Sequence, residues 1–294
     1  MTATTEATLS SIKTRRKSWL LRNLLPGAGW TVLAGLGSII FVLPFIWMVS
    51  TSFKPRWEQM IMPPKWIPSR IEWKNYTDPL TREPVALWYR STLTIVTLNV
   101  IGATLSSSLV AYGFARMKFR GRNTLFMLLL STMMLPSQVT LIPVYFFFAR
   151  LHWTDTLRPL IVPSYFAAPY YVFLLRQFFM TISTEYDDAA EIDGCGVFDV
   201  YRRIILPMCK PALAVVAITE FTGSWNDLFG PLIYLNTPAK FPIALGLRLL
   251  QIHGESQIGW MMAMTTLSII PLLVIFYTAQ RYFIQGIVIT GIKG

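Results

Sequence analysis

Six apolar stretches, each about as long as a lipid bilayer is thick, follow one another along this chain. A helix needs roughly 20 residues to cross about 30 Å of hydrocarbon. By that measure the candidate spans are about 28–50, 91–114, 123–149, 158–180, 209–235 and 259–283. The pattern predicts an all-α fold, a polytopic membrane protein with six transmembrane helices. An even number of spans places both ends of the chain on one side of the membrane.

We therefore expect three regions. A polar N-terminal tail covers residues 1–27, a six-helix transmembrane domain covers 28–283, and a short C-terminal tail covers 284–294. The first apolar stretch has no small-residue cleavage site after it, so we interpret it as a retained span and not as a signal peptide.

Prolines interrupt several of the predicted spans. The third span contains Pro136 and Pro143, the fourth contains Pro159, Pro163 and Pro169, and the fifth contains Pro231 near its end. A proline removes a backbone donor and clashes with the preceding turn. Such breaks survive in a bilayer only where protein or a water-filled cavity satisfies the freed carbonyls. The breaks therefore indicate a packed helical bundle.

The composition supports a membrane protein. Apolar residues make up 53% of the 294 residues, and mean hydropathy is +0.48. Only 14% of the residues are charged, against roughly 25% in soluble proteins. The net charge is +11, and the basic residues lie between the apolar runs. There they are explained by membrane topology and by contact with lipid headgroups, so they do not indicate a nucleic-acid partner. Cys195 and Cys209 lack metal-ligand spacing, and we expect free thiols.

The distribution of basic residues favours cytoplasmic termini. With both ends inside, the inner segments hold 15 Lys and Arg and the outer segments hold 11. This bias is modest but has the direction of the positive-inside rule. The strongest local signal is the loop that contains Arg116, Lys118, Arg120 and Arg122. The basic outer loop 53–90 runs against the rule, and the sequence leaves its role open.

The segment 181–207, between the fourth and fifth predicted spans, concentrates acidic side chains. It holds six of the 15 Asp and Glu residues of the chain. Thr184 and Asp187 fit a capping box, and Gly194 fits the end of a short helix because glycine accepts a positive φ. A second helix over about 196–205 then leads to a proline that we expect to start the fifth span. Two interpretations stay open: a rigid acidic helix that docks on a partner protein, or an ordinary solvated loop helix.

The spacing inside this segment resembles the EAA motif of ABC importer permeases. Asp188-Ala189-Ala190 is followed after three residues by Gly194, and after nine more by Ile204 and then Leu206-Pro207. Further matching pieces are Ala111 to Arg116, Phe119 to Arg122, Phe173 to Phe179, Ala190 to Gly194, Trp225 to Asp227, Gln280 to Phe283 and the final Lys293-Gly294. Over about residues 30–294 the chain is similar to the carbohydrate-uptake branch, and particularly to the second permease of maltose-type importers, with a MetI-like transmembrane domain.

Three positions of the motif region depart from that family. Asp188 stands where the family usually has Glu, Ser183 where it often has Pro, and Cys195 where it often has Ala. Each keeps a docking element in place, and each is expected to retune the contact.

The resemblance implies a multi-pass permease in the cytoplasmic (inner) membrane of a bacterium or archaeon, with N and C termini cytoplasmic. Segment 183–207 would be the cytoplasmic coupling-helix loop. The contact with the ATPase would be made by Asp188, Ala189, Ala190 and Gly194, and braced by Ile204, Leu206 and Pro207. The tail from Gly286 to Gly294 resembles one that reaches between ATPase subunits.

The resemblance also implies the partners. They are a second permease subunit, an ATPase homodimer, an extracytoplasmic substrate-binding protein and the lipid bilayer, with no nucleic acid. This chain has no phosphate-binding loop, so we expect neither enzymatic activity nor a cofactor on it. ATP and Mg would be used by the separate ATPase.

The fifth predicted span carries a polar stripe. Its members are Glu220, Gly223, Ser224 and Asp227 on one helical face, with Trp225 and Asn226 beside them. An ionisable group within a span usually faces the protein interior or a polar cavity. One interpretation is a translocation pathway, since aromatic faces with amide and carboxylate groups suit sugar rings. The other is hydrogen bonding to neighbouring helices or to the second permease, which the resemblance favours.

The remaining candidate chemistry is sparse. His152 and His253 are isolated and indicate neither a metal site nor catalysis. The outer loop from Asn236 to Gln257 is expected to contact the binding protein. The expected function is translocation of a mono-, di- or oligosaccharide delivered by that protein. The alternatives are the same machinery importing a polyol or glycerol phosphate, and a stand-alone secondary transporter; a membrane enzyme would need a polar catalytic cluster that the sequence lacks.

Overall fold

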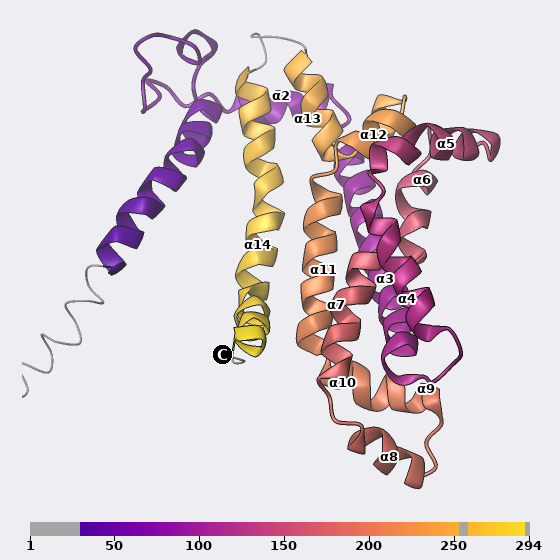
Figure 1. The fold of residues 1–294 in the computed structure, drawn as a ribbon. Helices are drawn as coiled ribbons and strands as arrows, with labels where there is room; N and C mark the ends of the chain where they lie inside the picture. The colour runs from indigo at the N-terminus through magenta and orange to yellow at the C-terminus, as the bar shows by residue number, and fades with distance from the viewer. Residues whose placement is uncertain (1–29, 253–257, 292–294) are drawn as a thin grey trace, which may run out of the picture. The chain divides into compact units, whose positions relative to one another are not determined.

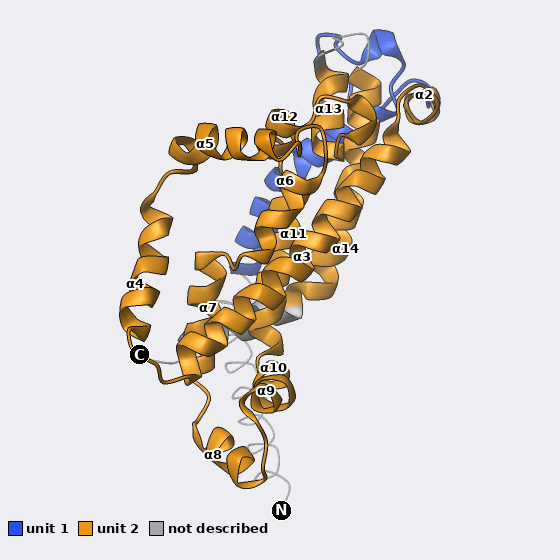
Figure 2. Ribbon diagram, turned by 90° about the vertical axis from the view of Figure 1, so that its right-hand side faces the viewer, with its two compact units in different colours: residues 1–72 blue, residues 73–294 orange. Residues whose placement is uncertain are grey.

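The computed structural model describes residues 30–252 and 258–291, and this part of the chain contains helices and loops without a strand. The all-α prediction is confirmed for these residues (Figure 1). The chain divides into two compact units, residues 1–72 and 73–294 (Figure 2). The predicted N-terminal tail over 1–27, His253 and the last three residues lie outside the described residues.

The first unit contains a long helix and a loop. The helix, Trp30–Ser52, is 23 residues long and apolar enough to cross a membrane. The loop after it begins with a short 3-10 helix, η1, Arg56–Glu58. The Glu58 carboxylate accepts hydrogen bonds from the Ser69 amide at 3.0 Å and from the Lys65 ammonium at 3.1 Å. Hydrogen bonds from Ser69, supported by Lys65, lower the pKa of Glu58 to about 2.

Four helices of the second unit run side by side (Figures 1 and 2). They are α3, Val85–Arg116, α7, Pro169–Met180, α11, Lys210–Trp225, and α14, Ile258–Gly291. Helix α3 contacts both α7 and α11, and α11 contacts α14. Because α14 is continuous to Gly291, the predicted boundary at 283 between the last span and a tail does not interrupt the helix.

Shorter elements cover the two ends of this bundle (Figure 1). One end carries α8, Glu185–Ile192, α9, Val197–Asp199, the π-helix η4, Val200–Ile205, and α10, Leu206–Met208. The other end carries α2, Lys74–Arg82, α5, Ser137–Arg150, α12, Phe229–Tyr234, η5, Pro238–Lys240, and α13, Ile243–Ile252. Between the ends lie α4, Arg122–Ser131, η2, Thr132–Met134, α6, Arg158–Ile161, and η3, Val162–Tyr165.

The predicted count of six spans is not confirmed. Among the described residues, three helices qualify as spans by length and apolarity: Trp30–Ser52, Val85–Arg116 and Ile258–Gln280. Two further pairs qualify only as broken spans. Arg122–Met134 and Ser137–Arg150 meet at 96°, and Val197–Met208 and Lys210–Trp225 meet at 78°.

Proline explains most of these breaks. Pro136, in extended backbone, separates η2 from α5 and turns the third predicted span by 96°. The fourth predicted span, 158–180, is divided into α6, η3 and α7, each of which has a proline at its first or second position. A proline at a helix start costs no hydrogen bond, whereas one in the interior does. The sequence predicted interruptions at these prolines but not the angles at which the pieces meet.

Two glycines allow close contacts in the bundle. A Cβ on Gly102 of α3 would lie 2.7 Å from the Ser164 hydroxyl oxygen and from the Tyr165 ring, both in η3. A Cβ on Gly246 of α13 would lie 2.3 Å from the buried Trp88 ring. Small residues at such positions let helices approach closely in a bilayer, where packing drives their association.

We expect Gly102→Ala to destabilise the protein by about 1–3 kcal/mol, because the methyl group overpacks a tight contact. The matched control is Gly223→Ala in α11, where the added Cβ has nothing within 4 Å. That control should be neutral or stabilising by about 0.5–1 kcal/mol, since alanine favours the helix. Thermal unfolding of the purified variants measures both effects, and equal midpoints for the two variants would contradict the close contact.

Candidate functional site

Helix α8 lies at one end of the second unit and is the short acidic helix that the sequence predicted (Figure 2). Gly194 ends it with a φ of +80°, as predicted. The amide of Gly194 donates to the carbonyl of Glu191 at 3.0 Å, and the amide of Cys195 donates to that of Ala190 at 2.9 Å. These bonds satisfy carbonyls that would otherwise be unpaired at the helix end.

The predicted capping box at the start of α8 is wrong. Thr184 makes no side-chain cap bond, and its carbonyl accepts the amides of Asp187 and Asp188. The Asp187 carboxylate instead pairs with the Arg116 guanidinium, with Oδ2 2.9 Å from Nη1. A guanidinium that is almost completely buried needs a charged partner more than a solvated helix amide does.

Arg116 joins three elements at this end of the bundle. It stands in the last turn of α3, and its side chain is only 8% exposed. Besides Asp187, its Nη2 donates to the carbonyls of Phe179 at 3.0 Å and Ile182 at 2.8 Å, just at and beyond the end of α7. Burial raises the pKa of Asp187, Arg116 opposes that rise, and Asp188 adds to it. The ion pair therefore offsets the cost of burying the two charges and fixes the position of α8 relative to α3.

Arg116 is the last member of a polar stripe along α3. Ser108, Tyr112 and Arg116 are four residues apart, so they share one face of the helix. The Ser108 hydroxyl lies 2.8 Å from that of Tyr201, and the Tyr112 hydroxyl donates to the Val197 carbonyl at 3.1 Å. The stripe thus contacts the π-helix, α9 and α8 in turn, and holds the whole segment against α3.

Arg176 of α7 makes the reciprocal contact to α3. Its Nε donates to the carbonyl of Phe114 at 3.2 Å, and its guanidinium lies 4.2 Å from the centre of the Phe126 ring of α4. Arg116 and Arg176 therefore each bind carbonyls at the C-terminal end of the other's helix. Cations are favourable there because the helix dipole is negative at that end. Both residues lie in pieces that match the family, Ala111 to Arg116 and Phe173 to Phe179, but the sequence assigned neither of them a contact.

The seven residues predicted for coupling divide into two groups. Asp188, Ala189 and Gly194 are exposed and available to a partner, whereas Ala190 is 4% exposed and packs into the core of this chain. Ile204 and Leu206 are half-buried against the same core, and Pro207 is exposed. Ile205, a position that the motif does not specify, is fully buried. Ala190 therefore seats α8 on the core of this chain, and its contact with the partner stays a prediction.

Pro207 does not start the fifth span. It lies at the start of α10, and Pro211 occupies the corresponding position in α11. The chain bends by 78° between the two helices, around the fully buried Cys209. Both cysteines are free thiols, as predicted. The α9–α10 arm consequently crosses the end of the bundle and does not continue the span.

The polar stripe of α11 makes hydrogen bonds within this chain. Ser224 Oγ donates to Glu220 Oε1 at 3.0 Å and accepts from Asn99 of α3, also at 3.0 Å. Asp227 accepts the Gly230 amide at 3.1 Å at the start of α12. Trp225 is buried and stacks on Phe221, with centroids 5.4 Å apart.

Asn226 is exposed, as is Gly223, and the Asn226 amide side chain donates to the Thr222 carbonyl at 2.8 Å. These contacts fit the helix-bonding interpretation of the stripe.

A clasp holds two loops together at the opposite end of the second unit. Asp155, at a φ of +55°, accepts hydrogen bonds from the amides of Asn236 and Thr237, both at 3.0 Å. It also accepts from the Thr237 hydroxyl and the Lys240 ammonium, both at 2.7 Å. Lys240, with Thr237, holds the pKa of Asp155 well below its usual range. The sequence did not single out Asp155, because its partners lie about 80 residues away.

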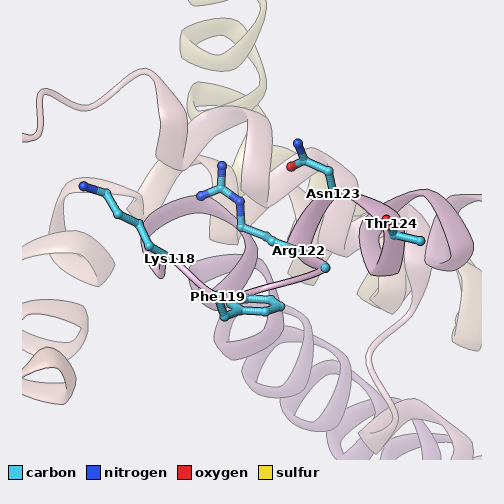
Figure 3. Close-up of a pocket in the computed structure, with 6 residues that line it drawn as sticks. Lys118, Phe119, Arg122, Asn123 and Thr124 are labelled. Carbon is cyan, nitrogen blue, oxygen red and sulfur yellow. The ribbon is translucent and has the colours of Figure 1, made fainter.

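The basic loop between α3 and α4 forms an open concave surface. Its cavity volume is about 530 Å³, and its lining includes Lys118, Phe119, Arg122 and Asn123 (Figure 3). Lys118 and Arg120 are exposed, whereas Arg116, at the end of α3, is not. Arg122, the fourth cation of this loop, is half-buried and donates to the Met117 carbonyl at 3.2 Å. Within the described ranges, no group of three His, Cys, Asp or Glu side chains is placed to hold a metal ion.

Comparison with known proteins gives a consistent result. Residues 99–289 match the family described as "binding-protein-dependent transport system inner membrane component". The chain is 31% identical over 278 residues to an arabinooligosaccharides transport system permease of Halalkalibacterium halodurans, covering 93% of this chain and 99% of that one. It is 30% identical over 266 residues to a trehalose/maltose transport system permease of Thermococcus litoralis, covering 88% and 94%.

A solved structure shares the fold. The crystal structure of a bacterial ABC transporter that imports the acidic polysaccharide alginate has a TM-score of 0.78 at 21% identity, covering 89% of this chain and 98% of that chain. The relatives are permease subunits and not enzymes. Since the family match covers well over half of the residues, this chain belongs to the inner-membrane permeases of binding-protein-dependent ABC importers.

Proposed function

We propose that this chain is one of two permease subunits that together carry an oligosaccharide across the cytoplasmic membrane, driven by a separate ATPase homodimer that uses ATP and Mg. The observation that carries the proposal is the anchored α8 segment. Arg116, Tyr112 and Ser108 fix this segment to α3, while Gly194 and Asp188 stay exposed at its tip. A solvated loop helix without a partner would need no such anchoring.

The exposed surface of the segment supports a protein partner. Ile192, which is 86% exposed, is one turn after Asp188 in α8 and next to Asp193, and Phe198 of α9 is 63% exposed. Large apolar side chains at the centre of a charged surface are typical of docking sites. The complementary surface would be a cleft on the ATPase with an apolar floor and a basic rim.

The anchoring suggests how motion would be transmitted. When ATP closes the ATPase dimer, the two coupling segments would move with its subunits. Because Arg116 binds α3, α8 and the end of α7 together, these elements would move as one body. Rigid-body rotation of this kind changes which side of a transporter is open. In this arrangement the α8 end, both termini and the basic α3–α4 loop face the cytoplasm.

The substrate class follows from the relatives. The permeases named above serve arabinooligosaccharides and trehalose or maltose, and the similar solved importer takes alginate. None of these names a polyol or glycerol phosphate. A second crystal structure of an alginate importer, with a TM-score of 0.59, contains a periplasmic protein bound to an alginate pentasaccharide. We infer that an extracytoplasmic binding protein likewise delivers the sugar to this chain, at the end held by the Asp155 clasp.

We expect Gly194→Arg to abolish transport-coupled ATPase activity while the permease still inserts into the membrane, because a bulky cation would obstruct docking. Gly194→Ala is the matched control. Any side chain at a φ of +80° costs about 1–2 kcal/mol, so alanine reproduces the strain without the obstruction. ATPase activity stimulated by the sugar-loaded binding protein is the measurement. Full stimulation of the arginine variant, or equal loss in both variants, would contradict docking at this tip.

The oligosaccharide assignment is tested on the cognate binding protein. Thermal unfolding with a panel of mono-, di- and oligosaccharides, polyols and glycerol phosphate should show the largest upward shift with an oligosaccharide, since a ligand stabilises the state it binds. Uptake by the complete complex should follow the same order. A shift confined to a polyol or to glycerol phosphate would overturn the substrate class and leave the coupling proposal intact.

A further inference from the structure

The loop after helix Trp30–Ser52 exposes an unusual set of large apolar side chains. This set, here named the loop patch, consists of Trp57, Met60, Met62, Trp66, Ile67 and Ile71. Met62 is 87% exposed and Ile67 81% exposed. Exposed apolar groups this dense are costly in water and usually mark a surface that another phase or molecule covers.

Contacts within the first unit hold the loop patch next to the C-terminal end of helix Trp30–Ser52. The Trp66 ring packs edge-on against the Trp47 ring, with centroids 5.3 Å apart, and the Trp66 carbonyl accepts a hydrogen bond from the Ser50 hydroxyl. The Glu72 amide also donates to the Phe53 carbonyl at 2.9 Å. The loop therefore folds back on the last turn of the helix and does not extend away from it. That helix is long and apolar enough to span the membrane, and its last turn would then mark the bilayer surface.

The charged side chains around the loop patch indicate what kind of surface would cover it. Arg56, Lys65 and Arg70 are exposed around the loop patch. Of the two acids in the loop, Glu58 is buried against Lys65, and Glu72 lies 3.9 Å from Arg70. Tryptophan is enriched where hydrocarbon meets headgroups, and basic side chains there bind anionic lipid. The combination matches the interfacial zone of a membrane.

We propose that the loop patch inserts into the interfacial zone of the leaflet at which helix Trp30–Ser52 ends, with Arg56, Lys65 and Arg70 on anionic phospholipid headgroups. The apolar side chains lie at the boundary between headgroups and acyl chains, and the basic side chains lie just above them. This arrangement accounts for part of the basic outer loop that runs against the positive-inside rule. It depends on neither the sugar nor the ATPase, so its failure leaves the proposed function untouched.

Spin-label depth measurements on the assembled complex in bilayers test the insertion. A label at Ile67→Cys, in a Cys195→Ala background, is compared with a bilayer reference at Ile40→Cys and a water reference at Asn236→Cys. We expect the Ile67 label to lie between the references in accessibility to both oxygen and a neutral nickel chelate. A label as accessible to nickel as Asn236 would overturn the proposal, and so would one shielded from both reagents, which would mean that a protein covers the loop patch.

Lipid charge tests the basic side chains. Adding phosphatidylglycerol to phosphatidylcholine vesicles should lower nickel access at the Ile67 label by about two-fold, as expected for several cations near an anionic surface. This difference should become clearly smaller in Arg56→Gln/Arg70→Gln, which leaves Lys65 in place, and persist in full in the control Lys74→Gln, which removes an exposed cation outside the loop patch. An unchanged lipid dependence in the double variant would contradict the headgroup contact.

Discussion

The buried guanidinium of Arg116 is the interaction on which the functional end of this protein depends. A buried cation is tolerated only when it is paired and hydrogen-bonded. Here the pairing uses one carboxylate, Asp187, and two carbonyls at and beyond the end of α7. The positions of α3, α7 and α8 are thereby fixed by one side chain. Arg176 repeats the contact in the opposite direction.

This arrangement gives the coupling segment the stiffness that its proposed function requires. A force applied to an isolated eight-residue helix would deform the chain around it. Helix α8 instead rests on Ala190 in the core, and its flanking arm is held through Tyr201 and Val197. Packed interfaces change between discrete arrangements and do not deform continuously. Displacement of α8 would therefore move α3 and α7 with it.

Local sequence patterns predicted much of this structure, and the features that they did not predict depend on contacts between residues far apart in the sequence. The helical fold, the position of α8 and its end at Gly194 follow from apolar length and from glycine chemistry. The path of the broken spans did not, because a proline shows where a helix stops and not the angle at which the next begins. Asp187 was assigned to a local cap because its actual partner, Arg116, lies 71 positions earlier in the sequence. The inward face of Ala190 likewise depends on tertiary packing.

A distance measurement between α3 and α8 tests whether Arg116 makes the two helices move as one body. Spin labels at Lys118→Cys, two residues beyond the end of α3, and at Glu185→Cys, the exposed first residue of α8, report on these two helices in the complete importer, in a Cys195→Ala background. The account predicts one distance distribution that is the same with and without ATP, that broadens in Arg116→Ala, and that persists in the control Arg120→Ala. A distance that changes with ATP while Arg116 is present would show that α8 moves independently of α3 and would contradict the account.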